Sequence, residues 1–446
     1  MAQIRSKPFG VTKEGANVTE YTLSNPGGLS VSVLDYGCVI KNIIVPAKNG
    51  PVDVVIGHDT MADYEADFLS PSSTCCGAFV GRYANRIENA EFSVGGATYK
   101  LEANNGPNHL HGCFNRKLYR VKSFGDTLLM EAESPDGEDG FPGNLKIAVR
   151  YTLTEDNAFR MDYRVSSDAD TIVNLTNHSY FNLDGGGDVL NQKLRIYASR
   201  YLEGNNQCCP TGAILPVADT PMDFTAGKLI GREIDTGFAQ TTMVGGGYDH
   251  CYVIDRARGS SQSICAWATS DKTGISMKLY TTQPGIQLYT ANFLQDCPSP
   301  GKGGKPLQKY GGFALETQHY PCSPSHPEFP STVLRAGKVF RATTTLRFFT
   351  GKQCAQVVSP RRSVDSVRLL FHAGTLSALA RRGRQQVAKY CHRSFSPFVP
   401  PPNPRANPLS CRPLTERSLP YTAHRLPPRD KCLLCGQQSI CQSRFS

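Results

Sequence analysis

The chain has 446 residues, with 48 lysines and arginines against 38 aspartates and glutamates, a formal net charge of +10. The charge is unevenly distributed: residues 1–350 hold 32 basic and 35 acidic side chains, whereas residues 351–446 hold 16 and 3. A body with a net charge of −3 has no electrostatic reason to bind nucleic acid. No apolar run reaches the ~18 to 20 residues that a bilayer span needs, so composition argues against an integral membrane protein and we expect no membrane partner.

The beginning of the chain and its cysteines predict a cytoplasmic protein. The first ten residues contain no apolar stretch of the length that a secretory signal requires. Ten of the 16 cysteines lie in residues 1–350, in two adjacent pairs and otherwise at scattered spacing. This pattern is typical neither of a disulfide framework nor of a paired metal-binding knuckle. We therefore expect reduced thiols with mostly structural roles.

Alternation of apolar and polar residues recurs along the first 350 residues, and it places one set of side chains on each face of a strand. It predicts strands over residues 29–34, 77–80, 91–94, 145–153, 159–165, 263–269, 275–281 and 339–349. The polar segment 155–158 is short enough to join two of them as a hairpin. Long helical patterns are almost absent, so we predict an all-β fold, a large antiparallel β-sandwich over residues 1–350.

Residues 351–446 form a second region, a basic tail rich in proline, cysteine and serine. Segment 363–390 has the spacing of an amphipathic helix weakened by two glycines, and the proline-rich stretch 396–428 predicts disorder. Three interpretations stay open. One is a disordered appendage that binds an acidic partner or a membrane surface through its positive charge. Another is translation past the usual stop, which the composition slightly favours. The third is a small metal-bound element that uses Cys411, Cys432, Cys435 and Cys441 as ligands. Of these, only the pair Cys432 and Cys435 has the spacing of a metal-binding knuckle.

Histidine-containing turns supply the candidate chemistry of the body. They read Asn-His-Leu-His-Gly at 108–112, Thr-Asn-His-Ser-Tyr at 176–180 and Tyr-Asp-His at 248–250. With Arg86 and Glu316 they offer proton donors and acceptors that work near neutral pH, without a fixed cofactor. Glu316 follows the apolar run 313–315, where burial is expected to raise the pKa of its carboxyl group.

Other site chemistries find less support in the sequence. His109 and His111 share one side of an expected strand, but no third ligand lies at a helpful spacing, so we expect no metal. The glycines at 245–247 lack the spacing of a nucleotide-binding fingerprint. No nucleophile elbow of the Gly-x-Ser-x-Gly type is present.

Six motifs in order resemble the aldose 1-epimerase, or galactose mutarotase, family over roughly residues 7–350. They are GRYANRI at 81–87, NHLHG at 108–112, TNHSYFNL at 176–183, GYDH at 247–250, TTQPGIQLYTANF at 281–293 and LETQ at 315–318. The resemblance implies a galactose mutarotase-like supersandwich. It also implies an isomerase that interconverts the α and β anomers of free aldohexoses such as galactose and glucose, with no cofactor and a small-molecule sugar as partner.

The resemblance also implies roles for individual residues. Glu316 would remove the proton from the O1 hydroxyl, and His178 would protonate the ring oxygen O5. A secondary role for His111 is to supply positive charge to the opening ring. The sugar would be bound by Asn85, Arg86, His111, Asp249 and Gln287. The aromatic platform that sugar sites often contain is left undecided among Tyr83, Tyr180, Phe181 and Tyr289.

Two alternatives remain at this point: a related sandwich that binds a sugar without turning it over, and a hexose-6-phosphate 1-epimerase. The presence of both Glu316 and His178 argues against the first. A phosphate calls for a clustered cationic subsite, and Arg86 is the only lysine or arginine among the candidate site residues. The preferred aldose and the oligomeric state are not predicted by the sequence.

Overall fold

The computed structural model describes residues 2–256 and 260–350. The expected helix over 363–390, the proline-rich stretch and the four tail cysteines lie outside the described residues, as does the region expected after residue 350. In the described part of the chain, neither helix is long and apolar enough to cross a lipid bilayer.

Antiparallel strands of the described residues form three larger sheets. The first contains, in order, β1 (Gln3–Val11), β2 (Asn17–Ser24), β3 (Ser30–Leu34), β4 (Ile40–Val45) and β5 (Val52–Asp53). The second contains β11 (Arg120–Phe124), β12 (Thr127–Ser134), β13 (Leu145–Leu153), β14 (Ala158–Ser167), β28 (Val339–Thr350), β24 (Ile275–Thr281), β23 (Ser263–Thr269), β18 (Lys193–Ile196) and β21 (Lys228–Leu229). The third contains β17 (Tyr180–Phe181), β26 (Phe313–Gln318), β25 (Gly285–Tyr289), β22 (Asp249–Val253), β19 (Arg200–Gly204) and β20 (Pro210–Pro216).

Smaller elements complete the described chain. Strand pairs are formed by β7 (Tyr83–Ile87) with β10 (His109–His111), β8 (Glu91–Val94) with β9 (Ala97–Lys100), β6 (Phe79–Val80) with β16 (Thr176–Asn177), and β15 (Thr171–Ile172) with β27 (Val333–Leu334). The helices are α1 (Met61–Phe68) and α2 (Ala239–Met243). Short 3-10 helices are η1 (Glu88–Ala90), η2 (Phe114–Arg116), η3 (Glu138–Gly140), η4 (Ile230–Glu233), η5 (Leu294–Asp296), η6 (Lys302–Gly304) and η7 (Ser323–Ser325).

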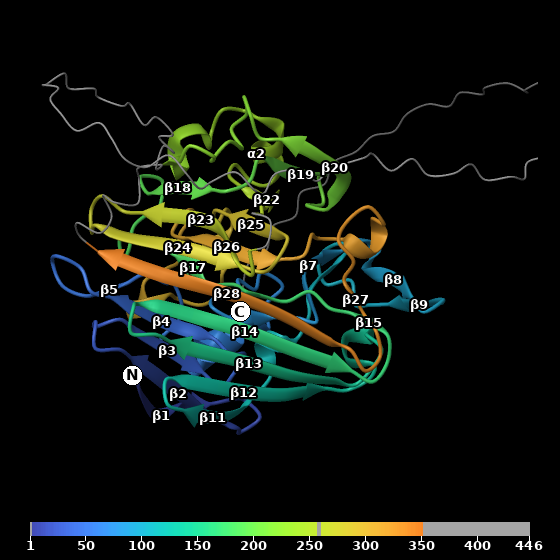
Figure 1. The fold of residues 1–446 in the computed structure, drawn as a ribbon, viewed down its shortest axis with the longest axis horizontal. Coiled ribbons are helices and arrows are strands. Elements are labelled where there is room, and N and C mark those ends of the chain that lie inside the picture. Colours follow the sequence, from blue (N-terminus) through green and yellow to red (C-terminus); the bar gives the residue numbers. More distant parts are fainter. Residues whose placement is uncertain (1, 257–259, 351–446) are drawn as a thin grey trace, which may run out of the picture. The chain divides into compact units, whose positions relative to one another are not determined.

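Strand β28 joins the two halves of the longest sheet, because it pairs with β14 on one side and β24 on the other (Figure 1). Along β13, buried residues alternate with more exposed ones from Leu145 to Leu153, so one face of this sheet is apolar. Buried side chains of all three larger sheets form one hydrophobic cluster, including Val31 of β3, Val149 of β13 and Leu288 of β25. The predicted antiparallel β-sandwich is confirmed.

The predicted strands agree with the structure except where local backbone geometry intervenes. The expected strands over 91–94, 145–153, 263–269 and 275–281 match β8, β13, β23 and β24. The expected strand over 77–80 is too long: only Phe79–Val80 is extended, because Cys75 and Gly77 have positive φ angles of 51° and 72° and form a turn. The hairpin connection ends at Asn157, and Ala158 already belongs to β14.

Helix α1 has the sequence features of a short amphipathic helix. The side chain of Thr60 caps its N-terminus by accepting a hydrogen bond from the Asp63 amide at 3.1 Å. Met61, Tyr64 and Phe68 recur at helical spacing and are buried. Asp67 is also buried on this helix.

Candidate active site

A pocket of about 300 Å³ contains most of the residues implied by the motifs. Asn85, Arg86, His111, His178, Asp249 and Glu316 line it, together with residues from segments 71–74 and 293–296. A pocket of this size is at the lower end of the range for small-molecule sites. A larger cavity of about 530 Å³ shares Leu294 with this pocket. Two of its charged side chains, Asp53 and Lys302, form an ion pair with each other at 2.7 Å. The motif residues named above line the smaller pocket, so we place the candidate site there.

Neighbouring strands of the third sheet place three of the polar side chains. Glu316 of β26 lies opposite Gln287 of β25, and Gln287 lies opposite Cys251 of β22. Asp249 precedes Cys251 by two residues, so the two share a face of β22. The Gln287 Nε2 amide donates to Asp249 Oδ1 at 2.7 Å. This hydrogen bond fixes the Asp249 carboxylate at the pocket wall.

His178 reaches the same pocket from the turn between β16 and β17. Its backbone amide donates to the carbonyl of Ala78 at 2.9 Å, and its own carbonyl accepts from the Gly77 amide. The ring lies against Tyr180, with centroids 4.9 Å apart. These contacts bring His178 Nε2 to 3.6 Å from Glu316 Oε1.

Both members of this pair are almost inaccessible, with exposed fractions of 5% for His178 and 2% for Glu316. Burial, then the charge of Asp249, raises the pKa of Glu316 to about 8, against a smaller opposing effect of Arg86. Burial lowers the pKa of His178 to about 4. Among the described residues, Glu316 Oε2 and His178 Nδ1 have no hydrogen-bond partner. The free pocket therefore holds a neutral carboxyl group and a neutral imidazole near pH 7.

His111 stands at right angles to His178, with ring centroids 5.3 Å apart. Its Nδ1 accepts the Asn85 amide at 3.2 Å, so the ring proton lies on Nε2. Burial, then the neighbouring His178 and Arg86, lowers the pKa of His111 well below its usual range. In the free pocket His111 is therefore a neutral N–H donor, without the positive charge expected as its secondary role.

Arg86 and Asn85 belong to β7, which pairs with the strand that carries His111. Asn85 Oδ1 accepts the Arg86 amide at 2.9 Å, and Arg86 Nε donates to Asn105 Oδ1 at 3.0 Å. These bonds orient the guanidinium beside the pocket. Sequence reasoning did not identify Asn105, although it lies in the turn immediately before the NHLHG motif.

Two residues that the sequence singled out, His109 and Gln287, do not line the pocket. His109 lies against Phe141, with Nδ1 bound to the carbonyl of Glu102. A register shift after Leu110 and the positive φ of His111 (67°) separate the two rings, so the pair forms no common metal site. Gln287 lines a small crevice adjacent to the pocket, which it also shares with Asp249.

The aromatic candidates separate by their position relative to the pocket. Tyr180 and Tyr289 line it, whereas Tyr83 and Phe181 lie in hydrophobic clusters away from its lining. Phe293, which was not among the predicted aromatic candidates, is 50% exposed and also lines the pocket. Its position at the end of the TTQPGIQLYTANF motif was the available signal. An exposed ring at a pocket rim is suited to stack against a sugar face.

Comparison with known proteins identifies the family. The family model described as aldose 1-epimerase matches residues 19–347. The aldose 1-epimerase of Escherichia coli (strain K12) is 36% identical over 337 residues, which cover 73% of this chain and 94% of that protein. The galactose mutarotase of Rattus norvegicus is 34% identical over 354 residues, which cover 78% and 99%.

A solved structure of the same kind supports the fold. The crystal structure of a GalM/aldose epimerase homologue from C. elegans superposes with a TM-score of 0.68 at 29% sequence identity, covering 78% of this chain and 99% of that one. The chain belongs to the aldose 1-epimerase family. It is accordingly an enzyme of the isomerase class that acts in carbohydrate metabolism.

Proposed function

We propose that this chain interconverts the α and β anomers of free aldohexoses such as galactose and glucose, with Glu316 as the base and His178 as the acid. The observation that carries the proposal is the buried pair itself: Nε2 and Oε1 are 3.6 Å apart in a pocket of about 300 Å³. Opening a sugar ring needs a base and an acid at the same time near neutral pH, and a carboxylate with an imidazole can supply both.

Glu316 and His178 together accept and donate every proton that the reaction moves. Glu316 takes the proton of the O1 hydroxyl, the C1–O5 bond breaks with its electrons moving to O5, and O5 takes a proton from His178. The product is the open-chain aldehyde. Rotation about C1–C2 presents the other face of the aldehyde, and the reverse transfers close the ring to the opposite anomer. No proton is lost to solvent over the cycle.

The pKa shifts support a particular resting state of the pair. A pKa of about 8 for Glu316 and of about 4 for His178 keeps one proton on the carboxyl group at neutral pH. Ring opening begins from the tautomer in which that proton has moved to His178. It ends with Glu316 protonated and His178 neutral, which is the arrangement of the free pocket. A single shared proton therefore serves both directions.

The remaining polar groups support binding of sugar hydroxyls. Asp249 accepts from Gln287 and retains acceptor capacity, while Gln287 Oε1 has no partner among the described residues. Further donors come from Arg86 and Asn85 of β7 and from the Nε2 proton of His111 on β10. For the stacking platform we propose Phe293, because it combines exposure with a place in the pocket lining.

The pocket lining disfavours a phosphorylated substrate. Among its lining residues Arg86 is the only arginine or lysine, and Asp249 and Asp296 add negative charge. A phosphate group binds best where several cations converge. A purely sugar-binding role is disfavoured by the desolvated Glu316 and His178, since burying groups with unsatisfied polar atoms costs stability that binding alone does not require.

Polarimetry with the full-length protein tests the proposal. Fresh α-D-galactose and α-D-glucose are expected to reach their equilibrium rotation many times faster than in buffer. Glucose 6-phosphate, added at the same concentration as galactose, is expected not to slow the galactose reaction. Equal rates with and without protein would support the binding module, and strong inhibition by glucose 6-phosphate would support the phosphate-specific alternative.

We also propose that the protein works in a reducing compartment such as the cytoplasm. All ten cysteines among the described residues are free thiols, which is the usual state of cysteines in the cytosol. We expect the enzyme to have the same activity whether or not a thiol reductant is present during purification. Oxidation of the thiols is expected to abolish that activity.

A further inference from the structure

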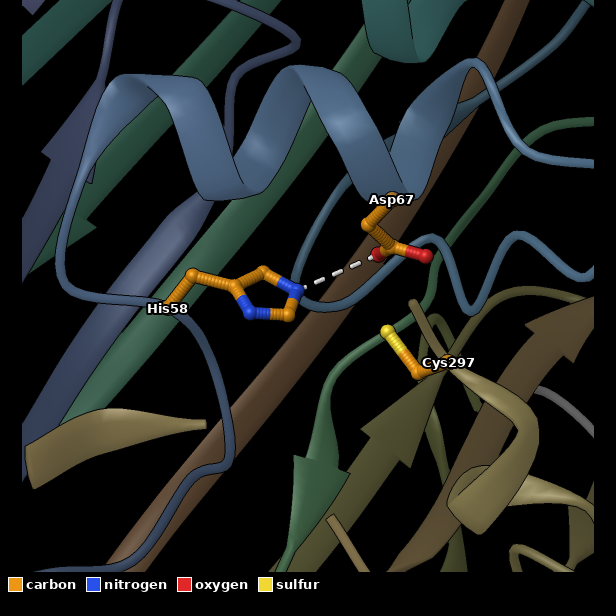
Figure 2. Close-up of side chains that lie close together, drawn as sticks. All are labelled: His58, Asp67 and Cys297. Carbon is orange, nitrogen blue, oxygen red and sulfur yellow. Dashed lines mark hydrogen bonds and ion pairs between the residues drawn. The ribbon is translucent and has the colours of Figure 1, made fainter. Parts of the chain in front are cut away.

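A second cluster of ionisable side chains lies outside the active-site pocket, where α1 meets the segment after η5. It contains His58, Asp67 and Cys297, whose potential ligand atoms all lie within 4.8 Å of one another. Figure 2 shows the three side chains pointing toward one another, with the sulfur atom of Cys297 facing the contact between the other two. The side chains of His58 and Asp67 are fully buried.

The contact between His58 and Asp67 has the dimensions of a metal site. Nε2 and Oδ2 are 3.3 Å apart, close to the ligand–ligand distance of a tetrahedral site with bonds of about 2.0 to 2.1 Å. A thiol of a third segment completes a set of one nitrogen, one oxygen and one sulfur ligand. Zn²⁺ is the common biological ion that accepts all three.

The groups around the cluster already orient its members as ligands. His58 Nδ1 donates to the carbonyl of Pro300 at 2.7 Å, which leaves Nε2 as the atom that faces Asp67. Asp67 Oδ1 accepts the Thr74 amide at 2.7 Å, and Oδ2 accepts the Thr74 hydroxyl at 2.6 Å. Hydrogen bonds of this kind, from a backbone carbonyl to a histidine and from donors to a carboxylate, normally surround metal ligands.

We propose that His58, Asp67 and Cys297 bind a Zn²⁺ ion that holds together two segments of the active-site wall. Thr74, which binds Asp67, lines the pocket, and so do Leu294 and Asp296 just before Cys297. The Thr74 carbonyl also accepts the Tyr180 hydroxyl at 3.0 Å. The ion would therefore link α1, the 74–76 turn and the 294–300 segment. Spacing in the sequence did not predict this set, because Cys297 lies far along the chain from His58 and Asp67.

The experiment measures bound metal in the purified full-length protein. After incubation with Zn²⁺ and dialysis, the wild type is expected to retain one equivalent, measured by mass spectrometry. Replacement by Co²⁺ is expected to give an absorption band of thiolate-to-cobalt charge transfer. Cys297→Ser, which leaves the His58–Asp67 contact in place, is expected to lose that band and to bind zinc at least tenfold more weakly.

A matched control separates this site from the cysteines of the tail. The double variant Cys432→Ser/Cys435→Ser removes the suitably spaced pair at 432 and 435 and is expected to retain the zinc and the cobalt band. Cys265→Ser, a buried thiol in β23, is expected to behave in the same way. A wild type without stoichiometric zinc, or zinc that persists in Cys297→Ser and disappears in the tail variant, would overturn the proposal.

Discussion

Two buried histidine–carboxylate pairs in the described residues have nearly the same separation but opposite surroundings. His178 and Glu316 are 3.6 Å apart, and His58 and Asp67 are 3.3 Å apart. In the first pair, Glu316 Oε2 and His178 Nδ1 have no hydrogen-bond partner among the described residues. In the second, His58 Nδ1 donates to Pro300 and both oxygens of Asp67 accept from Thr74.

The pKa values follow this difference in surroundings. Burial dominates in the first pair, so the pKa of Glu316 is raised to about 8 and that of His178 is lowered to about 4. Burial also acts to lower the pKa of His58, but the hydrogen bond to Asp67 and the nearby thiols outweigh it and raise the pKa. A pair whose polar atoms are left unsatisfied in a pocket is suited to exchange protons with a ligand. A pair whose atoms are all engaged is suited to hold structure or an ion.

The largest effect is expected when the pair of His178 and Glu316 is broken by substitution. His178→Asn and Glu316→Gln are each expected to lower kcat/KM by about 10³-fold, within the 10² to 10⁴ range of general acid–base catalysis. Glu316→Gln should keep a wild-type melting temperature, because it removes no hydrogen bond made by the altered polar atoms. His178→Asn also removes the ring that packs against Tyr180, so its rate is compared at an equal concentration of folded protein. Polarimetry on α-D-galactose measures the rate. His326→Asn, in the loop after η7, is the control and should match the wild type.

Breaking the second pair should instead cost stability. Asp67→Ala leaves His58 and both Thr74 donors without their partner, and loss of one member of a buried pair costs about 3 to 5 kcal/mol. Urea unfolding should show this loss, with Glu316→Gln as the comparison variant. An unfolding free energy of Asp67→Ala within about 1 kcal/mol of wild type would contradict the contrast between the pairs.

The pH dependence of kcat/KM tests whether His178 and Glu316 exchange protons in the way the pKa values predict. The active form of the pair carries one proton. Below a pH of about 4 both groups are protonated, and above about 8 neither is, so the rate should fall at both ends and form a bell-shaped profile. The two limits belong to the pair as a whole. A rate that stays constant from pH 5 to 9 would show that Glu316 does not titrate in the expected range.

A smaller effect is expected from a neighbour of the pair. Gln287→Ala removes the amide that orients Asp249 at 2.7 Å, so KM should rise about 3- to 10-fold with a smaller change in kcat, as loss of one hydrogen bond predicts. Initial rates over a range of galactose concentrations separate the two constants. The exposed Gln207→Ala serves as the control. A fall in kcat alone would assign Gln287 to the chemical step.

Local alternation and the order of the motifs predicted many of the strands and most of the pocket residues. The features that depend on how distant strands pair were not predicted. The strands over 263–269 and 275–281 were predicted to the residue, because alternation is a local property. The separation of His109 from His111 was not predicted, since it depends on a register shift against β7. The places of Phe293, Asn105 and Cys297 were also missed, because each depends on how separate elements pack together and not on local alternation.

The most direct test of the shared proton is the mutarotation rate of fresh α-D-galactose for the double variant His178→Asn/Glu316→Gln beside the two single variants. Residues that act as one unit have strongly non-additive effects. The double variant is therefore expected to be within a few-fold of either single variant, all at equal concentrations of folded protein. Single variants with near-wild-type rates, or a double variant slower by the product of the two single losses, would contradict the account.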